Sequence, residues 1–236
     1  MLLAATRSAA AVIDPLHDAP DDPVTTELRR WLAGSSRFRA FFEVHAPKIR
    51  KKLRGAGDPD ARRDVRAELR AAHLLLADHR ISLAFEAYGA RKGGPDFTVT
   101  FRGERAFNLE VTRLRRPQGS AEIGSPILTK LHQLPPSVPN ALVLSVPGAG
   151  VDAVGVEAAM RDIRSRADRK DEAFFLARGF AGSRAFYERF LRLGAVMLWC
   201  EEASADSRAA LWVNRSARIA VPERAVRACV ICFQAG

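Results

Sequence analysis

The chain has 236 residues, 47% of them hydrophobic, which is enough for one sizeable domain with its own core and an appended helical segment. Its formal net charge of +10 and its pI of about 10.3 favour a polyanionic partner, nucleic acid first and an anionic membrane surface second, over a mere lineage preference for arginine. Three cysteines in a chain of this length exclude a disulfide framework, and no apolar run approaches the length that spans a bilayer.

The cysteine pattern and the N-terminus both indicate a reducing, cytoplasmic location. Cys229 and Cys232 have a CxxC spacing, but no second pair accompanies them and their apolar flanks are typical of a buried strand. We therefore expect a structural role for them rather than a zinc site, which wants four ligands. The opening segment MLLAATRSAAAVIDPL is interrupted by Arg7 and Asp14 and lacks a preceding basic region, so it is a poor signal peptide.

Residues 1–57 are expected to form an N-terminal arm, up to about residue 24, followed by a helical segment. Helical periodicity begins near Thr25 and stops at Gly34. Ser35 or Ser36 can cap a second helix, which Pro47 kinks or restarts. A run of cations closes this helix, and it either stabilises the helix dipole or contacts phosphates. The run comprises Lys48, Arg50, Lys51, Lys52 and Arg54.

Residues 58–236 are expected to form an α/β core domain. The continuous apolar runs at 141–146 and 195–201 are typical of central strands buried on both faces. The order of elements predicts a three-layer-like α/β sandwich, with a mixed central β-sheet flanked by helices and an N-terminal helical segment added to it. The other predicted elements are helices at 61–78, 125–134, 154–166 and 184–193, strands at 83–88, 96–101 and 106–114, and a last helix or strand at 223–233.

The stretch GPDFTVTFRGERAFNLEVTR, residues 94–113, predicts a hairpin with one apolar face and one polar face. A three-residue loop at 102–104 puts Asp96 directly opposite Glu110, with their Cβ atoms roughly 5 Å apart. Carboxylates this close repel unless a proton or cation lies between them, and Mg²⁺ prefers oxygen ligands. The alternative is an exposed hairpin face on which two acids happen to be neighbours. The polar set comprises Asp96, Thr98, Thr100, Asn108, Glu110 and Thr112, and the apolar set comprises Phe97, Val99, Phe101, Phe107, Leu109 and Val111.

The helix before the hairpin carries a third acid. Glu68 falls on the edge of its apolar stripe, and an acid placed there is costly unless it is paired or binds a cation. We therefore expect Glu68 to point toward the sheet. The stripe comprises Val65, Leu69, Ala72, Leu75 and Leu76.

The pattern AELRAAHLLL…FEAYGARKGGPDFTVTF…AFNLEVTR resembles the PD-(D/E)XK, or restriction-endonuclease-like, nuclease superfamily. Its members have a helix that bears a glutamate, then a hairpin with an aspartate after a proline on the first strand and E-x-K on the second. The motifs cover about residues 63–113. The resemblance implies a restriction-endonuclease-like fold in which Asp96, Glu110 and the Val111 carbonyl bind Mg²⁺ or Mn²⁺, while Glu68 acts through a bound water.

One position departs from the superfamily pattern. Thr112 stands where the superfamily has the lysine of E-x-K, and threonine can hydrogen-bond a water but carries no charge. Lys92, four residues before Asp96, could return an ammonium to the same place. Because the helix after this strand can also contribute polar groups in the superfamily, Lys130 and Gln133 are further candidates.

The resemblance implies a Mg²⁺-dependent nuclease that hydrolyses phosphodiester bonds, in DNA rather than RNA, with no membrane association and with a dimer as an open possibility. The alternative is a catalytically impaired nuclease-fold module that binds nucleic acid or a partner protein. In either case the backbone of the nucleic acid is expected to contact basic and polar side chains past the second hairpin strand, on the following helix and on the N-terminal helical segment. These candidates are Arg113, Arg115, Arg116, Lys130, Gln133, Arg50, Lys51 and Lys52.

Overall fold

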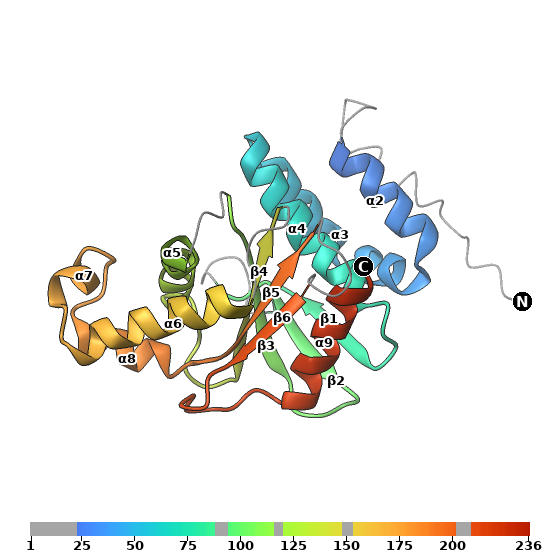
Figure 1. The fold of residues 1–236 in the computed structure, drawn as a ribbon. Coiled ribbons are helices and arrows are strands. Elements are labelled where there is room, and N and C mark those ends of the chain that lie inside the picture. The colour runs from blue at the N-terminus through green and yellow to red at the C-terminus, as the bar shows by residue number, and fades with distance from the viewer. Residues whose placement is uncertain (1–22, 88–93, 116–119, 148–152, 202–208) are drawn as a thin grey trace, which may run out of the picture. The chain divides into compact units, whose positions relative to one another are not determined.

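The computed structural model describes residues 23–87, 94–115, 120–147, 153–201 and 209–236. These ranges contain eight helices and six strands (Figure 1). Within them, no helix combines the length and apolar character that crossing a membrane requires. The chain divides into two compact units, Met1–His79 and Arg80–Gly236.

Within residues 23–79 the first unit contains three helices, whose ends follow the capping signals of the sequence. Ser35 caps the second helix by accepting a hydrogen bond from Phe38 N, and Asp58 caps the third in the same way. Pro47 lies inside the second helix, which continues through it as one element. The helices are α2 (Pro23–Gly34), α3 (Ser36–Gly55) and α4 (Pro59–Leu75).

The apolar stripe predicted on α4 is buried along its whole length, and Glu68 is buried with it. Helix α4 contacts both α2 and α3. It therefore belongs to the first compact unit, whereas the domain boundary expected from the sequence, after residue 57, placed it with the core domain.

The second unit is built on an open, mixed six-stranded sheet whose spatial order is the sequence order, β1 to β6. The first three strands are antiparallel, β3, β4 and β5 run parallel, and β6 is antiparallel to β5. The two continuous apolar segments form β4 and β5 in the middle of the sheet, and every residue of both is buried. The strands are β1 (Ile81–Phe85), β2 (Phe97–Phe101), β3 (Phe107–Arg113), β4 (Asn140–Val146), β5 (Leu193–Cys200) and β6 (Ala209–Val213).

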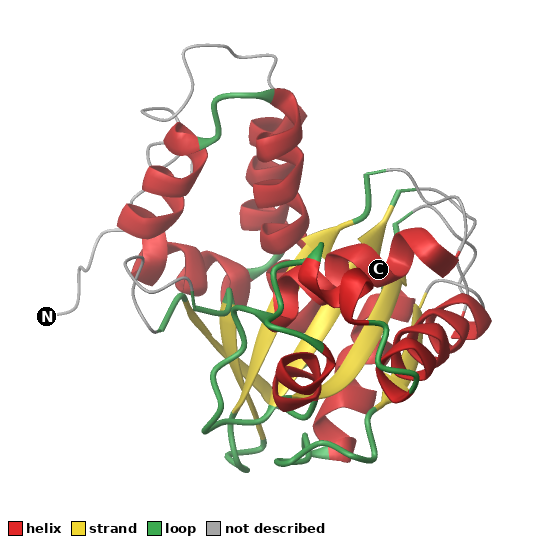
Figure 2. Ribbon diagram, turned by 90° about the vertical axis from the view of Figure 1, so that its left-hand side faces the viewer, coloured by secondary structure: helices red, strands yellow, loops and turns green. Residues whose placement is uncertain are grey.

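Helices of this unit lie on both faces of its sheet, so the α/β sandwich expected from the sequence is confirmed at that level (Figures 1 and 2). One face packs against α5, α6 and α8 through a large apolar cluster. On the other face α9 contacts β5 and β6, with Phe233 stacked on Trp199 at a ring distance of 5.3 Å. The helices are α5 (Ser120–Leu131), α6 (Ala153–Asp168), α7 (Glu172–Leu176), α8 (Ser183–Phe190) and α9 (Glu223–Ala235).

The β2–β3 hairpin has the predicted register. Phe97 pairs with Leu109 and Val99 with Phe107, so the six apolar side chains share one face. Arg102 and Gly103 both have positive φ, and the turn closes with a 2.8 Å hydrogen bond from Glu104 N to the Phe101 carbonyl.

The segment around the CxxC spacing is a helix, so of the helix or strand expected for this last element the helix is confirmed, and the strand suggested by the apolar flanks of the cysteines is wrong. In α9 the buried positions recur every three or four residues, as in an amphipathic helix, while Ile231 is 59% exposed. Cys229 and Cys232 are three residues apart, so both fall on the buried face. The buried residues are Ala225, Val226, Ala228, Cys229, Cys232 and Phe233.

Candidate functional site

The polar face of the hairpin is buried. Asp96 is 7% exposed, Glu110 is 3% exposed and Asn108 is fully buried. The alternative of a solvated hairpin face therefore does not hold for these three side chains. Buried acids and amides require hydrogen-bonding or charged partners, and the surrounding elements determine which partners they have.

Asp96 and Glu110 are neighbours across the two strands. Phe97 pairs with Leu109, so the next pair in the same register is Asp96 with Glu110. The Asp96 carboxylate is oriented by a backbone hydrogen bond, because Val111 N donates to its Oδ2 at 2.9 Å. The hairpin register agrees with the relation that the sequence predicted for the two acids, while their direct pairing stays a prediction.

Glu110 faces a lysine from α5. Lys130 Nζ lies 2.5 Å from Glu110 Oε1, and the side chains are 22% and 4% exposed respectively. Gln133, one turn further along the chain, accepts a hydrogen bond from the same ammonium at 3.4 Å. The lysine and glutamine proposed as candidates on this helix therefore lie together at the second acid of the hairpin.

The rest of the buried polar face is a structural network. Thr98 donates to the Asn108 amide oxygen at 3.4 Å, and Asn108 donates to Asn140 Oδ1 at 3.0 Å. The Asn140 amide nitrogen reaches three backbone carbonyls, those of Pro135, Val138 and Arg192. Asn140 was not singled out from the sequence, although a polar residue at the start of an apolar strand is a signal for such a role. This network ties β2, β3 and β4 together.

Glu68 is placed in the first unit, where Lys52 Nζ lies 2.5 Å from its Oε2. The cation that the buried acid needs is thus supplied by the basic run of α3. Of the other candidates in that run, Lys51 is exposed and Arg50 is half-buried. The role of Glu68 at a metal stays a prediction.

The remaining predicted residues are distributed around β3. Thr112 is half-buried and, two residues after Glu110, lies on the same face. Arg113 pairs with Ser145 and lies on the opposite face, while Arg115 is exposed beyond the strand. Lys92 and Arg116 fall outside the described residues.

Asp96 and Glu110 are the candidate ligands for a magnesium ion at this site. Among the described residues, no group of three or more His, Cys, Asp or Glu side chains is arranged to hold a metal. Magnesium, however, usually keeps several waters and is held by one or two carboxylates together with substrate phosphates. Asp96 and Glu110 offer that number and type of ligand, although Asp96 Oδ2 accepts from Val111 N and Glu110 Oε1 is paired with Lys130.

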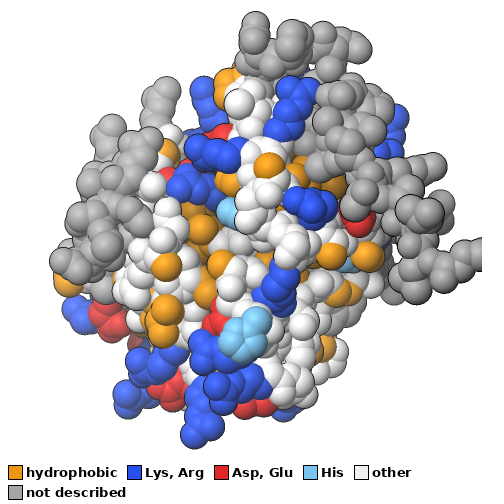
Figure 3. Space-filling view, turned by 90° about the vertical axis from the view of Figure 1, so that its right-hand side faces the viewer, with side chains coloured by type: hydrophobic (Ala, Val, Ile, Leu, Met, Phe, Trp, Pro, Cys, Tyr) orange, Lys and Arg blue, Asp and Glu red, His pale blue; other side chains and the backbone are white. Residues whose placement is uncertain are grey.

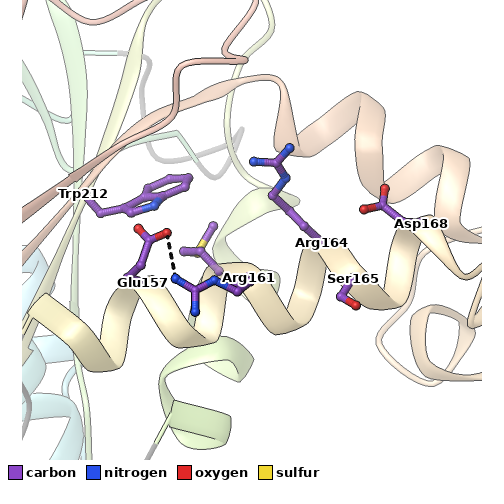
Figure 4. A pocket seen from close by; sticks show the side chains of 7 residues that line it. Glu157, Arg161, Arg164, Ser165, Asp168 and Trp212 are labelled. Atoms are coloured by element: carbon purple, nitrogen blue, oxygen red, sulfur yellow. Dashed lines mark ion pairs between the residues drawn. The ribbon is translucent and has the colours of Figure 1, made fainter.

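A separate pocket of about 270 Å³ lies between α6 and β6, with Trp212 on one side and Arg164 on the other (Figure 4). Its two arginines are matched by two acids, and Arg161 is paired with Glu157 at 3.6 Å. The lining therefore has no net charge and shows no preference for an anion. The lining residues are Glu157, Met160, Arg161, Arg164, Ser165, Asp168 and Trp212.

Basic side chains are spread over the molecular face shown in Figure 3, with fewer acidic side chains among them. This distribution agrees with the net charge of +10.

No family model, curated protein or solved structure matches this chain.

Proposed function

We propose that this protein is a Mg²⁺-dependent, restriction-endonuclease-like nuclease that hydrolyses phosphodiester bonds in DNA, and that Lys130 supplies the ammonium that the E-x-K lysine supplies in that superfamily. The observation that carries the proposal is the 2.5 Å contact between Lys130 Nζ and Glu110 Oε1. The strand has Thr112, which carries no charge, at the E-x-K lysine position, while Lys130 on α5 places an ammonium at Glu110.

The spacing supports this substitution. In E-x-K the lysine lies two residues after the glutamate, roughly 7 Å along the strand and on the same face. Lys130 reaches that face from the helix that covers it, with its side chain mostly buried. An ammonium held there is close to any phosphate that the two acids bind through a cation.

Each residue then has a stated task. A Mg²⁺ ion held by Asp96 and Glu110 would supply Lewis-acid stabilisation of the phosphate and a lowered pKa for the attacking water. The Val111 N–H keeps the Asp96 carboxylate in one orientation. The Lys130 ammonium donates to the attacking water or to a phosphate oxygen, where its charge opposes the negative charge that builds in the transition state. The water oxygen forms a bond to phosphorus and gives up a proton, the P–O bond to the leaving oxygen breaks, and the leaving oxygen takes up a proton, so the sum is the addition of one water.

The proposal is tested by incubating the purified protein with plasmid and linear DNA in Mg²⁺ or Mn²⁺, beside Asp96→Ala and Lys130→Met. Cleavage by the wild type that falls at least about 100-fold in each variant supports it, since losing one transition-state donor costs about that much. Arg227→Gln, which removes an exposed charge paired with Glu223 on α9, is the matched control and should cleave normally. Equal cleavage by all four proteins, or none by the wild type over a broad set of substrates, contradicts the proposal.

A second candidate function is metal-independent binding of nucleic acid by a nuclease fold that no longer cleaves. The same ion pair favours it, because Lys130 already compensates the charge of Glu110 without a metal. This candidate predicts salt-sensitive DNA binding that is unchanged by Mg²⁺ and by Glu110→Gln. A binding constant that responds to either change argues for the first candidate.

A further inference from the structure

Two arginines at the end of α8 reach across to the turn that follows α5. Arg189 Nη1 donates to the His132 carbonyl at 3.1 Å, and Arg192 Nη1 donates to the Leu134 carbonyl at 3.2 Å. Cations near the carbonyls of a helix C-terminus are favourable, which accounts for one hydrogen bond from each guanidinium. A guanidinium has five N–H donors, so most of their donors serve no contact within the described part of the chain.

A third arginine joins these two from the segment after β6. Arg218 N donates to the Leu191 carbonyl at 2.7 Å, which places Arg218 next to Arg192 although 26 residues separate them in the sequence. Its side chain is exposed and makes no hydrogen bond or ion pair with the residues that the structure describes. Arg189, Arg192 and Arg218 are called here the arginine cluster.

The arginine cluster carries a local excess of positive charge. Burial lowers the pKa of Arg192, and the charges of Arg189 and Arg218 lower it further, while Glu188 acts in the opposite direction. Glu188 itself is paired with Arg184 at 3.4 Å. Arg192 is held by its bond to the Leu134 carbonyl, while its buried Nε has no hydrogen-bond acceptor among the described residues.

The cluster contacts the chain two to four residues after Lys130, at the His132 and Leu134 carbonyls. Lys130 and Leu134 are four residues apart, so their Cα atoms are separated by at most about 14 Å. Phosphates of one DNA strand repeat every 3.4 Å along the helix axis, so this length corresponds to about four phosphates. A backbone whose scissile phosphate is at Lys130 therefore has further phosphates within reach of the cluster.

We propose that the arginine cluster binds backbone phosphates of the nucleic-acid substrate next to the Glu110–Lys130 pair, an inference that rests on the proposed function for the identity of the substrate. Arginine suits this task because its planar donor array matches phosphate oxygens in pairs. The contacts are independent of sequence, so the cluster positions the strand without selecting bases.

The test measures binding of a fluorescein-labelled DNA duplex of about 20 base pairs by anisotropy, in EDTA so that cleavage is prevented, from about 50 to about 200 mM salt. The variant Arg189→Gln/Arg192→Gln/Arg218→Gln should lower the slope of log K against log salt by about 2.7, which is about 0.9 for each lost phosphate contact. At about 0.1 M salt this corresponds to an affinity loss of about 500-fold.

The matched control, Arg63→Gln/Arg161→Gln/Arg227→Gln, also removes three positive charges, each paired with an acid three or four residues away on a helix surface. Its slope should change by less than about 1. Arg218→Gln alone should lower the slope by about 0.9, and it keeps the inference testable if the triple variant fails to fold.

Equal slopes for the two triple variants, or wild-type binding that does not vary with salt, overturn the inference. Failure of the proposed function gives a different result: the wild type does not cleave DNA in Mg²⁺, yet its binding still depends on the arginine cluster. In that case the cluster stands as a phosphate site and the nuclease proposal does not.

Discussion

Replacing Lys130 with methionine removes the cation at Glu110 and keeps a side chain of similar length. Breaking a buried ion pair by removing one partner costs about 3–5 kcal/mol, because the other charge stays buried. The Glu110 side chain is 4% exposed and that of Lys130 is 22% exposed, so water can approach from the lysine end. We therefore expect the lower end of that range, about 3 kcal/mol, or a melting temperature lower by about 6–12 °C.

The assay is urea unfolding followed by circular dichroism in EDTA, applied to the wild type, Lys130→Met, Glu110→Gln and the double variant. The double variant removes both charges and should lie within about 1 kcal/mol of the wild type, because neutral replacements of a buried pair are often tolerated. The coupling free energy between the two positions should then be at least about 2 kcal/mol. A Lys130→Met variant that loses less than about 1 kcal/mol of unfolding free energy would contradict this expectation if the effects of Lys130→Met and Glu110→Gln also add, because such a loss is typical of exposed ion pairs.

Two further predictions concern the framework. Gly194 is the second residue of β5 and lies where the pairing with β4 shifts register. An added Cβ would lie 2.7 Å from Val221 Cγ1, so Gly194→Ala should cost about 1–3 kcal/mol in urea unfolding, while Gly57→Ala, with open space around it, should not. Burial lowers the pKa of His73, and nearby arginines lower it further. Its contribution to stability is therefore complete above the pKa of 6.5 in the unfolded chain and is lost as the pH falls through the lowered pKa in the folded protein. The free energy of unfolding should therefore fall between about pH 7 and pH 5, and His73→Phe should reduce that slope, with the residual slope attributable to His45, whose pKa burial also lowers.

The hairpin and the central strands were predictable because their signals are local. Alternation of apolar and polar residues sets the faces of β2 and β3, and only one loop length keeps both faces matched, so the hairpin register followed from the sequence. The buried run of β4 was equally readable. Helix α9 was not, because its closely spaced apolar residues fit a strand as well as one face of a helix.

The partners of the acids depend on tertiary packing and were less accessible. Lys130 could be named only as a candidate on the following helix, since its reach to Glu110 depends on how α5 lies over β3. Lys52 and Glu68 are 16 residues apart in the sequence, so their pairing depends on how α3 packs on α4. The arginine cluster left no signal, because Arg218 approaches Arg192 only through the segment that follows the edge strand.

If Lys130 on α5 replaces the E-x-K lysine, a lysine introduced at position 112 of the strand should in turn replace Lys130. DNA cleavage in Mg²⁺ is compared for the wild type, Lys130→Met and the double variant Thr112→Lys/Lys130→Met. We expect Lys130→Met to cleave at least about 100-fold more slowly than the wild type. The double variant should cleave at least about tenfold faster than Lys130→Met, because a lysine at position 112 lies on the same face as Glu110. Lys130→Met cleaving as fast as the wild type, or a double variant no faster than Lys130→Met, would contradict it.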